Sequence, residues 1–307
     1  MSGVDESDLN IMMCCASCGI AGADDVKKLK NCTACYLVKY CGVKCQKDHR
    51  PQHKRACKKR AAELRDDILF KQPESSGLGD CPICFLPLSL DNDKSTLMSC
   101  CCKKICNGCN YANVMREEEM RLKKSCPFCR RPLPKSKEGA YRNYMKRIEV
   151  NDPAALRHMG GKRCREGDYK GAADYFKKAA KLGDAESHFQ LSILYQDGEG
   201  GVEKDEKKEV YHLEEAAIGG HPVARHDLGV IENDNGRKER AVKHWIIAAN
   251  MGQDHSLENL KLPCREGLVS KEDFTSALRA HQTAVDATKS PQREVAERFW
   301  REEAARV

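Results

Sequence analysis

The sequence predicts a multi-domain protein in which two small, metal-stabilised α+β fingers precede an all-α domain of repeated helical hairpins. Seventeen of the nineteen cysteines lie before residue 130, mostly in closely spaced pairs. An alanine-rich helical motif recurs after residue 154. Each cysteine-rich segment is too short to bury a core of its own and needs cross-links, whereas the repeated half can fold by ordinary packing.

Metal ions are the expected cross-links. The first ten residues, MSGVDESDLN, have neither the basic nor the apolar region of a secretory signal, so we expect a cytoplasmic or nuclear protein whose thiols stay reduced. No run approaches about 18 apolar residues, which predicts that the chain does not span a membrane.

The first cysteine block supplies eight candidate zinc ligands in four pairs. They are Cys15, Cys18, Cys32, Cys35, Cys41, Cys45, His53 and Cys57. Two intervening residues suit a zinc knuckle, and ligands four positions apart share one face of a helical turn, so the block predicts two tetrahedral sites. The spacing allows consecutive or alternate pairing. Cys14 and His49 are alternative ligands that fit the spacing less well.

With Tyr40 before Cys41 and Gln46 after Cys45, this block resembles the MYND finger over its whole length. The resemblance implies alternate pairing, with one zinc ion on the first and third pairs and the other on the second and fourth. Members of this family often have a tryptophan three residues before the ligand histidine, where this chain has Arg50. A peptide groove built on that indole is therefore not implied.

The second block has nine cysteines for eight ligand positions. They are Cys81, Cys84, Cys100, Cys101, Cys102, Cys106, Cys109, Cys126 and Cys129. This block resembles a RING finger of the all-cysteine kind, which implies two further zinc ions. In that arrangement the pairs at 81/84 and 106/109 share one ion, and a central pair joins the last pair on the other. Cys100 belongs to the central pair, and its partner stays open between Cys101 and Cys102.

A RING finger docks a ubiquitin-conjugating enzyme and holds its thioester-linked ubiquitin in position, so the resemblance implies a ubiquitin ligase that acts by positioning. The docking residues it implies are Ile83, Met115, Leu122, Pro127 and Arg130. Residues 111–124, which include two of them, are predicted to be a helix. The alternative is a non-enzymatic adaptor, a scaffold or transcriptional co-regulator. Filled four-ligand sets leave no open coordination position, which indicates structural rather than catalytic zinc.

The second half contains an internal repeat. Ala-Ala pairs begin at positions 179, 216 and 248, each near the end of a helical pattern, and one repeat has a longer turn at 195–205. Over residues 154–283 this pattern resembles the Sel-one-like repeat, a relative of the tetratricopeptide repeat. The resemblance implies stacked helical hairpins with a concave surface for peptides or partner proteins.

The predicted order is a disordered tail (1–14), the first finger (15–57), a linker (58–80), the second finger (81–133), a linker (134–153), the repeats (154–283) and a C-terminal helix or tail (284–307). The formal net charge of +7 does not indicate a nucleic-acid partner. Fifteen thiolates and four zinc ions would cancel that excess, and the basic segment 54–60 is expected to be a solvated helix face. The expected partners are proteins: a conjugating enzyme at the second finger and substrates at the first finger and repeats.

Overall fold

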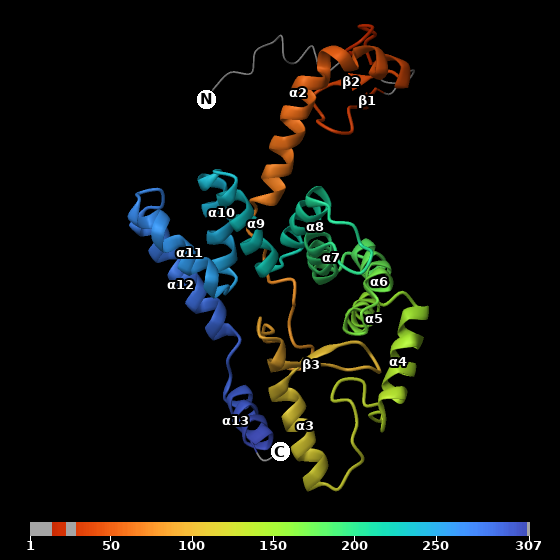
Figure 1. Ribbon diagram of the computed structural model, residues 1–307, viewed down its shortest axis with the longest axis vertical. Helices are drawn as coiled ribbons and strands as arrows, with labels where there is room; N and C mark the ends of the chain where they lie inside the picture. The colour runs from red at the N-terminus through yellow and green to blue at the C-terminus, as the bar shows by residue number, and fades with distance from the viewer. Residues whose placement is uncertain (1–13, 23–28, 306–307) are drawn as a thin grey trace. The chain divides into compact units, whose positions relative to one another are not determined.

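The computed structural model describes residues 14–22 and 29–305, and its contacts divide the chain into two units, Met1–Lys71 and Gln72–Val307 (Figure 1). Small cysteine-rich fingers come first, and an all-helical repeat domain follows them. The predicted fold class is confirmed. In the part of the chain that the structure describes, no helix is both long and apolar enough to cross a membrane.

The first finger combines a short sheet with a long helix. Its elements are strands β1 (Lys30–Asn31) and β2 (Lys39–Tyr40), which pair antiparallel, and helix α2 (Val43–Leu69). Helix α2 continues past Cys57 to Leu69, through residues predicted to be a linker. That segment is rich in Lys, Arg, Ala, Glu and Leu, which favour helix, and Arg60 pairs with Glu63 one turn further on at 3.2 Å.

The second finger lies in the second unit and has its own small core. Its elements are the 3-10 helix η1 (Asn92–Lys94), the antiparallel strands β3 (Ser95–Leu97) and β4 (Lys104–Cys106), and helix α3 (Asn107–Glu119). Helix α3 begins and ends earlier than the predicted span 111–124. The thiol of Cys106 caps its start by accepting the N–H of Cys109 at 3.4 Å. A Schellman motif ends it, with Arg121 in the left-handed region at φ 52°.

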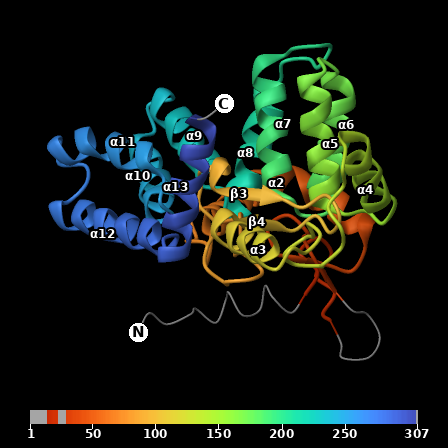
Figure 2. The same cartoon turned by 90° about the horizontal axis from the view of Figure 1, so that it is seen from below.

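The repeat domain is a series of helical hairpins (Figure 2). Its helices are α5 (Pro153–Arg165), α6 (Tyr169–Lys181), α7 (Ala185–Asp197), α8 (Glu206–Ile218), α9 (Pro222–Asp234), α10 (Lys238–Asn250), α11 (Asp254–Arg265) and α12 (Lys271–Ala287). Aspartates cap several of these helices, as where Asp184 accepts the N–H of Ser187 at 2.7 Å. The first alanine of each recurring pair, Ala179, Ala216 and Ala248, is fully buried.

Glycines let the helices of a hairpin approach closely. A Cβ added to Gly160 in α5 would meet the ring of Phe176 in α6 at 2.5 Å, and one added to Gly229 in α9 would meet the indole of Trp245 in α10 at 2.3 Å. The first and third hairpins therefore share one packing scheme, in which an aromatic ring covers a helical glycine.

We expect Gly160→Ala to lower the free energy of unfolding of the chain by about 1–3 kcal/mol, because a buried ring must move to admit the methyl group. Urea unfolding followed by circular dichroism measures this. The adjacent Gly161→Ala is the control, since its added Cβ would only approach the end of the Arg165 side chain at 3.8 Å. Equal losses from the two substitutions would contradict the packing argument.

Two further helices flank the hairpins. Residues predicted to be a linker form helix α4 (Lys137–Glu149), whose Tyr144 stacks on His158 of α5 with 3.9 Å between ring centroids. Helix α13 (Pro291–Ala305) lies in the region predicted to be a C-terminal helix or tail, and it packs against α3 of the second finger (Figure 1).

Candidate metal centres

Sixteen of the predicted ligands gather into four groups of four, and within each group the ligand atoms lie within 4.8 Å of one another. The groups are Cys15/Cys18/Cys41/Cys45, Cys32/Cys35/His53/Cys57, Cys81/Cys84/Cys106/Cys109 and Cys100/Cys101/Cys126/Cys129. In each finger the two groups alternate along the chain, which ties the whole finger into one unit. This is the alternate pairing that the family resemblances implied.

The spacing of the sulfur atoms fits zinc. A tetrahedral ion with Zn–S bonds of about 2.3 Å separates its sulfurs by about 3.8 Å. Observed S–S distances are 3.6 Å for Cys18 to Cys41, 3.7 Å for Cys32 to Cys57 and 3.7 Å for Cys84 to Cys106. In the fourth group the S–S distances are 3.3 Å for Cys100 to Cys129 and 3.9 Å for Cys101 to Cys126. Four sulfurs, or three and an imidazole, thus surround a space of the size of one zinc ion.

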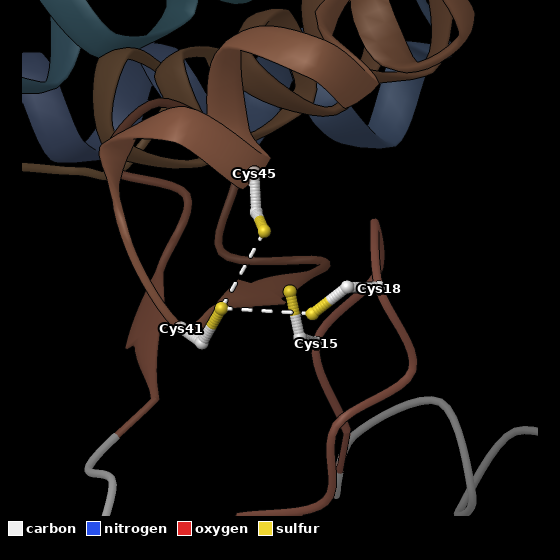
Figure 3. A group of neighbouring side chains, drawn as sticks. All are labelled: Cys15, Cys18, Cys41 and Cys45. Carbon is white, nitrogen blue, oxygen red and sulfur yellow. Dashed lines mark hydrogen bonds between the residues drawn. The ribbon is translucent and has the colours of Figure 1, made fainter.

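In the first group the ligands come from three separate parts of the finger (Figure 3). Cys15 and Cys18 lie on one loop, Cys41 directly follows β2, and Cys45 lies in the first turn of α2, and their sulfurs point toward one another. In the second group, the Nε2 atom of His53 lies 3.2 Å from the sulfur of Cys35.

The alternative ligands of the first block lie outside the groups. His49 is hydrogen-bonded through Nδ1 to the Tyr40 hydroxyl at 3.1 Å and stacks on His53. Cys14 forms a β-bridge with Ala21. Both residues therefore make contacts within the finger without belonging to a ligand group.

Four of the five Cys-x2-Cys pairs have the same backbone geometry, and the fifth, Cys106/Cys109, spans the start of α3 instead. The residues that follow the second cysteine of these four pairs are Gly19, Tyr36, Phe85 and Arg130. Each has a positive φ, between 58° and 70°, and donates its N–H to the carbonyl of the first cysteine at 2.8–3.0 Å. Only glycine adopts this conformation without strain, so three of the four knuckles carry a cost of about 1 kcal/mol that ligand binding must offset.

The thiols of one group cannot all be charged without a cation. In the first group, hydrogen bonds from backbone N–H groups outweigh burial and lower the pKa of Cys15 to about 6, while hydrogen bonds with neighbouring thiols raise the pKa of Cys41 to about 12. In the second group, the pKa of Cys32 is lowered to about 6, and burial raises that of Cys57 to about 12. A divalent ion bound at each group would remove this repulsion.

The second finger uses Cys101 and not Cys102 beside Cys100. The turn between β3 and β4 gives Cys102 a φ of 53° and directs its side chain into a buried cluster with Tyr144 and Met159. Burial raises the pKa of the Cys102 thiol to about 12. Cys102 thus joins the finger to α4 and α5.

Replacing Cys101 by serine is expected to lower the zinc content from about four to about three ions per chain, because the fourth group then loses a thiolate. The matched Cys102→Ser variant should keep all four, and its main effect should be loss of stability from a hydroxyl in an apolar cluster. Metal analysis of the two purified variants checks this. Loss of zinc from Cys102→Ser alone would reverse the assignment.

The predicted docking residues differ in how far their side chains are exposed. Ile83 and Met115 are half-buried, Leu122 is 47% exposed beyond the end of α3, and Pro127 is buried. Arg130 is exposed, but its guanidinium donates to Asn113 Oδ1 at 3.1 Å. The more exposed apolar side chains at the knuckles are Phe85, at 76%, and Phe128, at 42%. Sequence reasoning missed these two, although each lies beside a zinc-ligand cysteine.

Arg293 of α13 was also missed, and it anchors α13 to the second finger. Its side chain is 8% exposed and donates to the carbonyls of Pro87 at 2.6 Å, Leu86 at 3.0 Å and Thr288 at 2.7 Å, with Cys84 Sγ 3.4 Å away. The contact continues along the helix, where Phe299 packs on Tyr111 and Glu297 pairs with Lys94. An isolated arginine in a helical segment carries no sequence signal for this role.

Arg293→Ala is expected to cost about 3 kcal/mol of stability, because it removes a buried guanidinium and its hydrogen bonds to the carbonyls of Leu86 and Pro87. Hydrogen exchange should show faster exchange in residues 84–88 and in α13, with little change in α7 and α8. The exposed Arg298→Ala on the same helix is the control. If both variants exchange like the unaltered chain, the anchoring role of Arg293 is wrong.

Comparison with known protein families supports two of the predicted segments, the first finger and the repeats. Residues 15–57 match the MYND finger, and residues 154–184, 185–221 and 224–253 match the Sel1 repeat. The chain is therefore a zinc-finger protein with helical repeats. Its first finger is a MYND finger, and its first three hairpins, α5 to α10, are Sel1 repeats.

Two curated relatives share parts of the chain. Chitin synthase regulatory factor 4 of Schizosaccharomyces pombe is 30% identical over 29% of this chain, and DAP3-binding cell death enhancer 1 of Mus musculus is 23% identical over 55% of it. The matches span 14% and 41% of those proteins, so the chain covers less than half of either.

Two solved structures are similar in part. A Sel1 repeat protein from Oxalobacter formigenes matches 64% of this chain and 86% of its own, with 21% identity and a TM-score of 0.43. A protective antigen of uropathogenic Escherichia coli with an SLR fold matches 54% of this chain and 37% of its own, with 25% identity and a TM-score of 0.38.

Proposed function

We propose that this chain is a protein-interaction protein of the cytoplasm or nucleus that holds four structural zinc ions and brings partner proteins together. The observation that carries the proposal is the set of four ligand groups, each made of four protein side chains. Filled sites make rigid surfaces and offer no open coordination position. The names of the two curated relatives, a regulatory factor and a binding protein, support an interaction role.

The proposed activity of the second finger is that of a RING-type ubiquitin ligase. Its two ligand groups alternate along the chain, as the resemblance implies, and Phe85 and Phe128 expose apolar rings beside their knuckles. Such a finger acts by positioning: the apolar side chains contact the conjugating enzyme, and Arg130 offers a forked donor to the enzyme-bound ubiquitin. The MYND finger and the repeats would hold the substrate protein.

Autoubiquitination with a panel of conjugating enzymes tests this activity. Ile83→Ala and Arg130→Ala should abolish or strongly reduce chain formation, while the neighbouring Arg131→Ala, which also removes an exposed arginine, should not. Zinc content must be unchanged in all three. If no ubiquitin chains form with any enzyme of the panel, the ligase proposal is wrong.

A non-enzymatic adaptor is the second candidate, and two observations favour it. Pro127, an implied docking residue, is buried, and Arg293 of α13 binds the loop that follows the first knuckle. An adaptor would form no ubiquitin chains and would still bind its partners. Co-purification of partner proteins with the Arg130→Ala variant would detect that binding.

A further inference from the structure

Helix α2 exposes a strongly basic face that the metal centres do not use. Six basic side chains are exposed along it: Lys44, Lys47, Arg50, Lys54, Arg55 and Lys58. None of the six forms an ion pair within residues 14–22 and 29–305. The same helix carries only one acidic residue, Asp48, before Glu63.

The six side chains share one side of the helix. At about 100° per residue they fall within an arc of about 140°. The ligands that α2 contributes, Cys45, His53 and Cys57, fall on the remaining circumference and face the finger. Zinc binding therefore fixes the direction of this basic face, because the opposite side of the helix is held by the ions.

The charges on this face repel one another. Lys44, Lys47 and Arg50 follow at intervals of three residues, and Arg50, Lys54 and Lys58 at intervals of four. Like charges at these spacings lie one above the other and destabilise a helix. An anionic partner along the face would remove that repulsion and add attraction, so the face is better suited to the bound state than to the free one.

We propose that the basic face of α2 binds an extended, acidic peptide segment of a partner protein. From Lys44 to Lys58 the face is about 21 Å long, which about six or seven residues of extended chain can follow. Arg50 lies halfway along the length of the face, at one edge of its arc, and its forked guanidinium donors suit carboxylates. The inference rests on the proposed protein-interaction role and specifies the chemistry of one partner.

A peptide fits this face better than a nucleic acid does. Fifteen thiolates and four zinc ions cancel the formal charge excess of +7, so the whole chain has no net positive charge with which to attract a phosphate backbone. The helix also has no Phe, Tyr or Trp between Lys44 and Lys58 on which bases of a single strand could stack.

Fluorescence anisotropy of the full, zinc-loaded chain tests the proposal. The probes are a fluorescein-labelled heptapeptide of alternating Asp and Glu, the matching Asn/Gln heptapeptide, and labelled duplex and single-stranded DNA. We expect the acidic peptide to bind most tightly and to weaken as salt is raised. The double variant Arg50→Gln/Lys54→Gln should bind it about tenfold more weakly.

The control Lys30→Gln/Arg60→Gln removes the same charge away from the face and should keep most of the affinity. A charge reversal, Arg50→Glu/Lys54→Glu, should instead bind a heptapeptide of Lys and Arg, which a merely unfolded variant would not do. Equal loss in the control, equal binding of the neutral peptide, or tighter binding of either DNA would overturn the proposal. Zinc content and autoubiquitination of the variants should be unchanged, so a failure here is distinguishable from a failure of the proposed function.

Discussion

Removing zinc from the intact chain is expected to unfold both fingers while the repeat hairpins stay folded. A structural zinc site contributes about 10–16 kcal/mol in small fingers, which is as large as the whole stability of an ordinary domain. In the first finger the buried cluster consists of Cys15, Cys32, Cys35 and Tyr40, so three of its four members are proposed ligands. Without the ions this core consists of thiols that repel one another when charged.

The repeat hairpins do not depend on the ions. One of their clusters joins Phe176, Leu191, Leu194 and Tyr195 with buried alanines, and none of its buried members is a proposed ligand. Limited proteolysis with and without a high-affinity zinc chelator, mapped by mass spectrometry, should therefore show new cleavage in residues 30–69 and 81–133 and continued protection of residues 169–265. Added zinc should restore protection, and added magnesium should not. Simultaneous digestion of the hairpins would contradict this separation.

The ligand pairs were predictable because metal binding imposes short, regular spacings on the sequence. The hairpins were predictable because each repeat buries its Ala-Ala pair in the same way. The choice between Cys101 and Cys102 was not predictable, since it depends on a single positive φ in the turn after β3 and on the Tyr144 side chain that covers the second thiol. Local spacing carries no information about either.

Contacts between segments distant in the chain could not be predicted from the sequence either. Arg293 binds carbonyls about two hundred positions earlier in the chain, and backbone carbonyls have no residue signature. Helix α2 is longer than expected for a different reason: its second half is rich in charged residues, which favours a linker. High intrinsic helix propensity after a zinc-anchored first half continues the helix, and of residues 58–69 only Leu69 is buried.

The second large effect expected is a loss of stability of the repeat domain in mild acid. His244 in α10 is fully buried, and burial together with Arg225 and Arg240 lowers its pKa to about 3. Burial and the neighbouring His188 lower the pKa of His212 in α8 to about 4. An unfolded histidine has a pKa of about 6.5, so the unfolded chain binds more protons between these values. The stabilisation is complete above pH 6.5 and falls as the pH drops toward 4.

Two carboxyls act in the opposite direction. Burial raises the pKa of Asp227 to about 6 and also raises the pKa of Glu209, so their contributions to stability grow as the pH falls toward 4. Burial also lowers the pKa of His158, His188 and His226, which adds to the loss. The net loss between pH 6.5 and 4 should be roughly 3 kcal/mol.

Urea unfolding at several pH values, followed by fluorescence in a Trp300→Phe background, measures this loss at Trp245, which is then the only tryptophan and lies buried in α10. In that background His244→Gln should flatten the pH dependence of the unfolding free energy, because the glutamine side chain takes up no proton on unfolding. The control His255→Gln makes the same change at an exposed position and should leave that pH dependence unchanged. A slope that is unchanged in His244→Gln would assign the acid sensitivity to other groups. Because the readout lies in the repeats, release of zinc from the fingers at low pH does not imitate the effect.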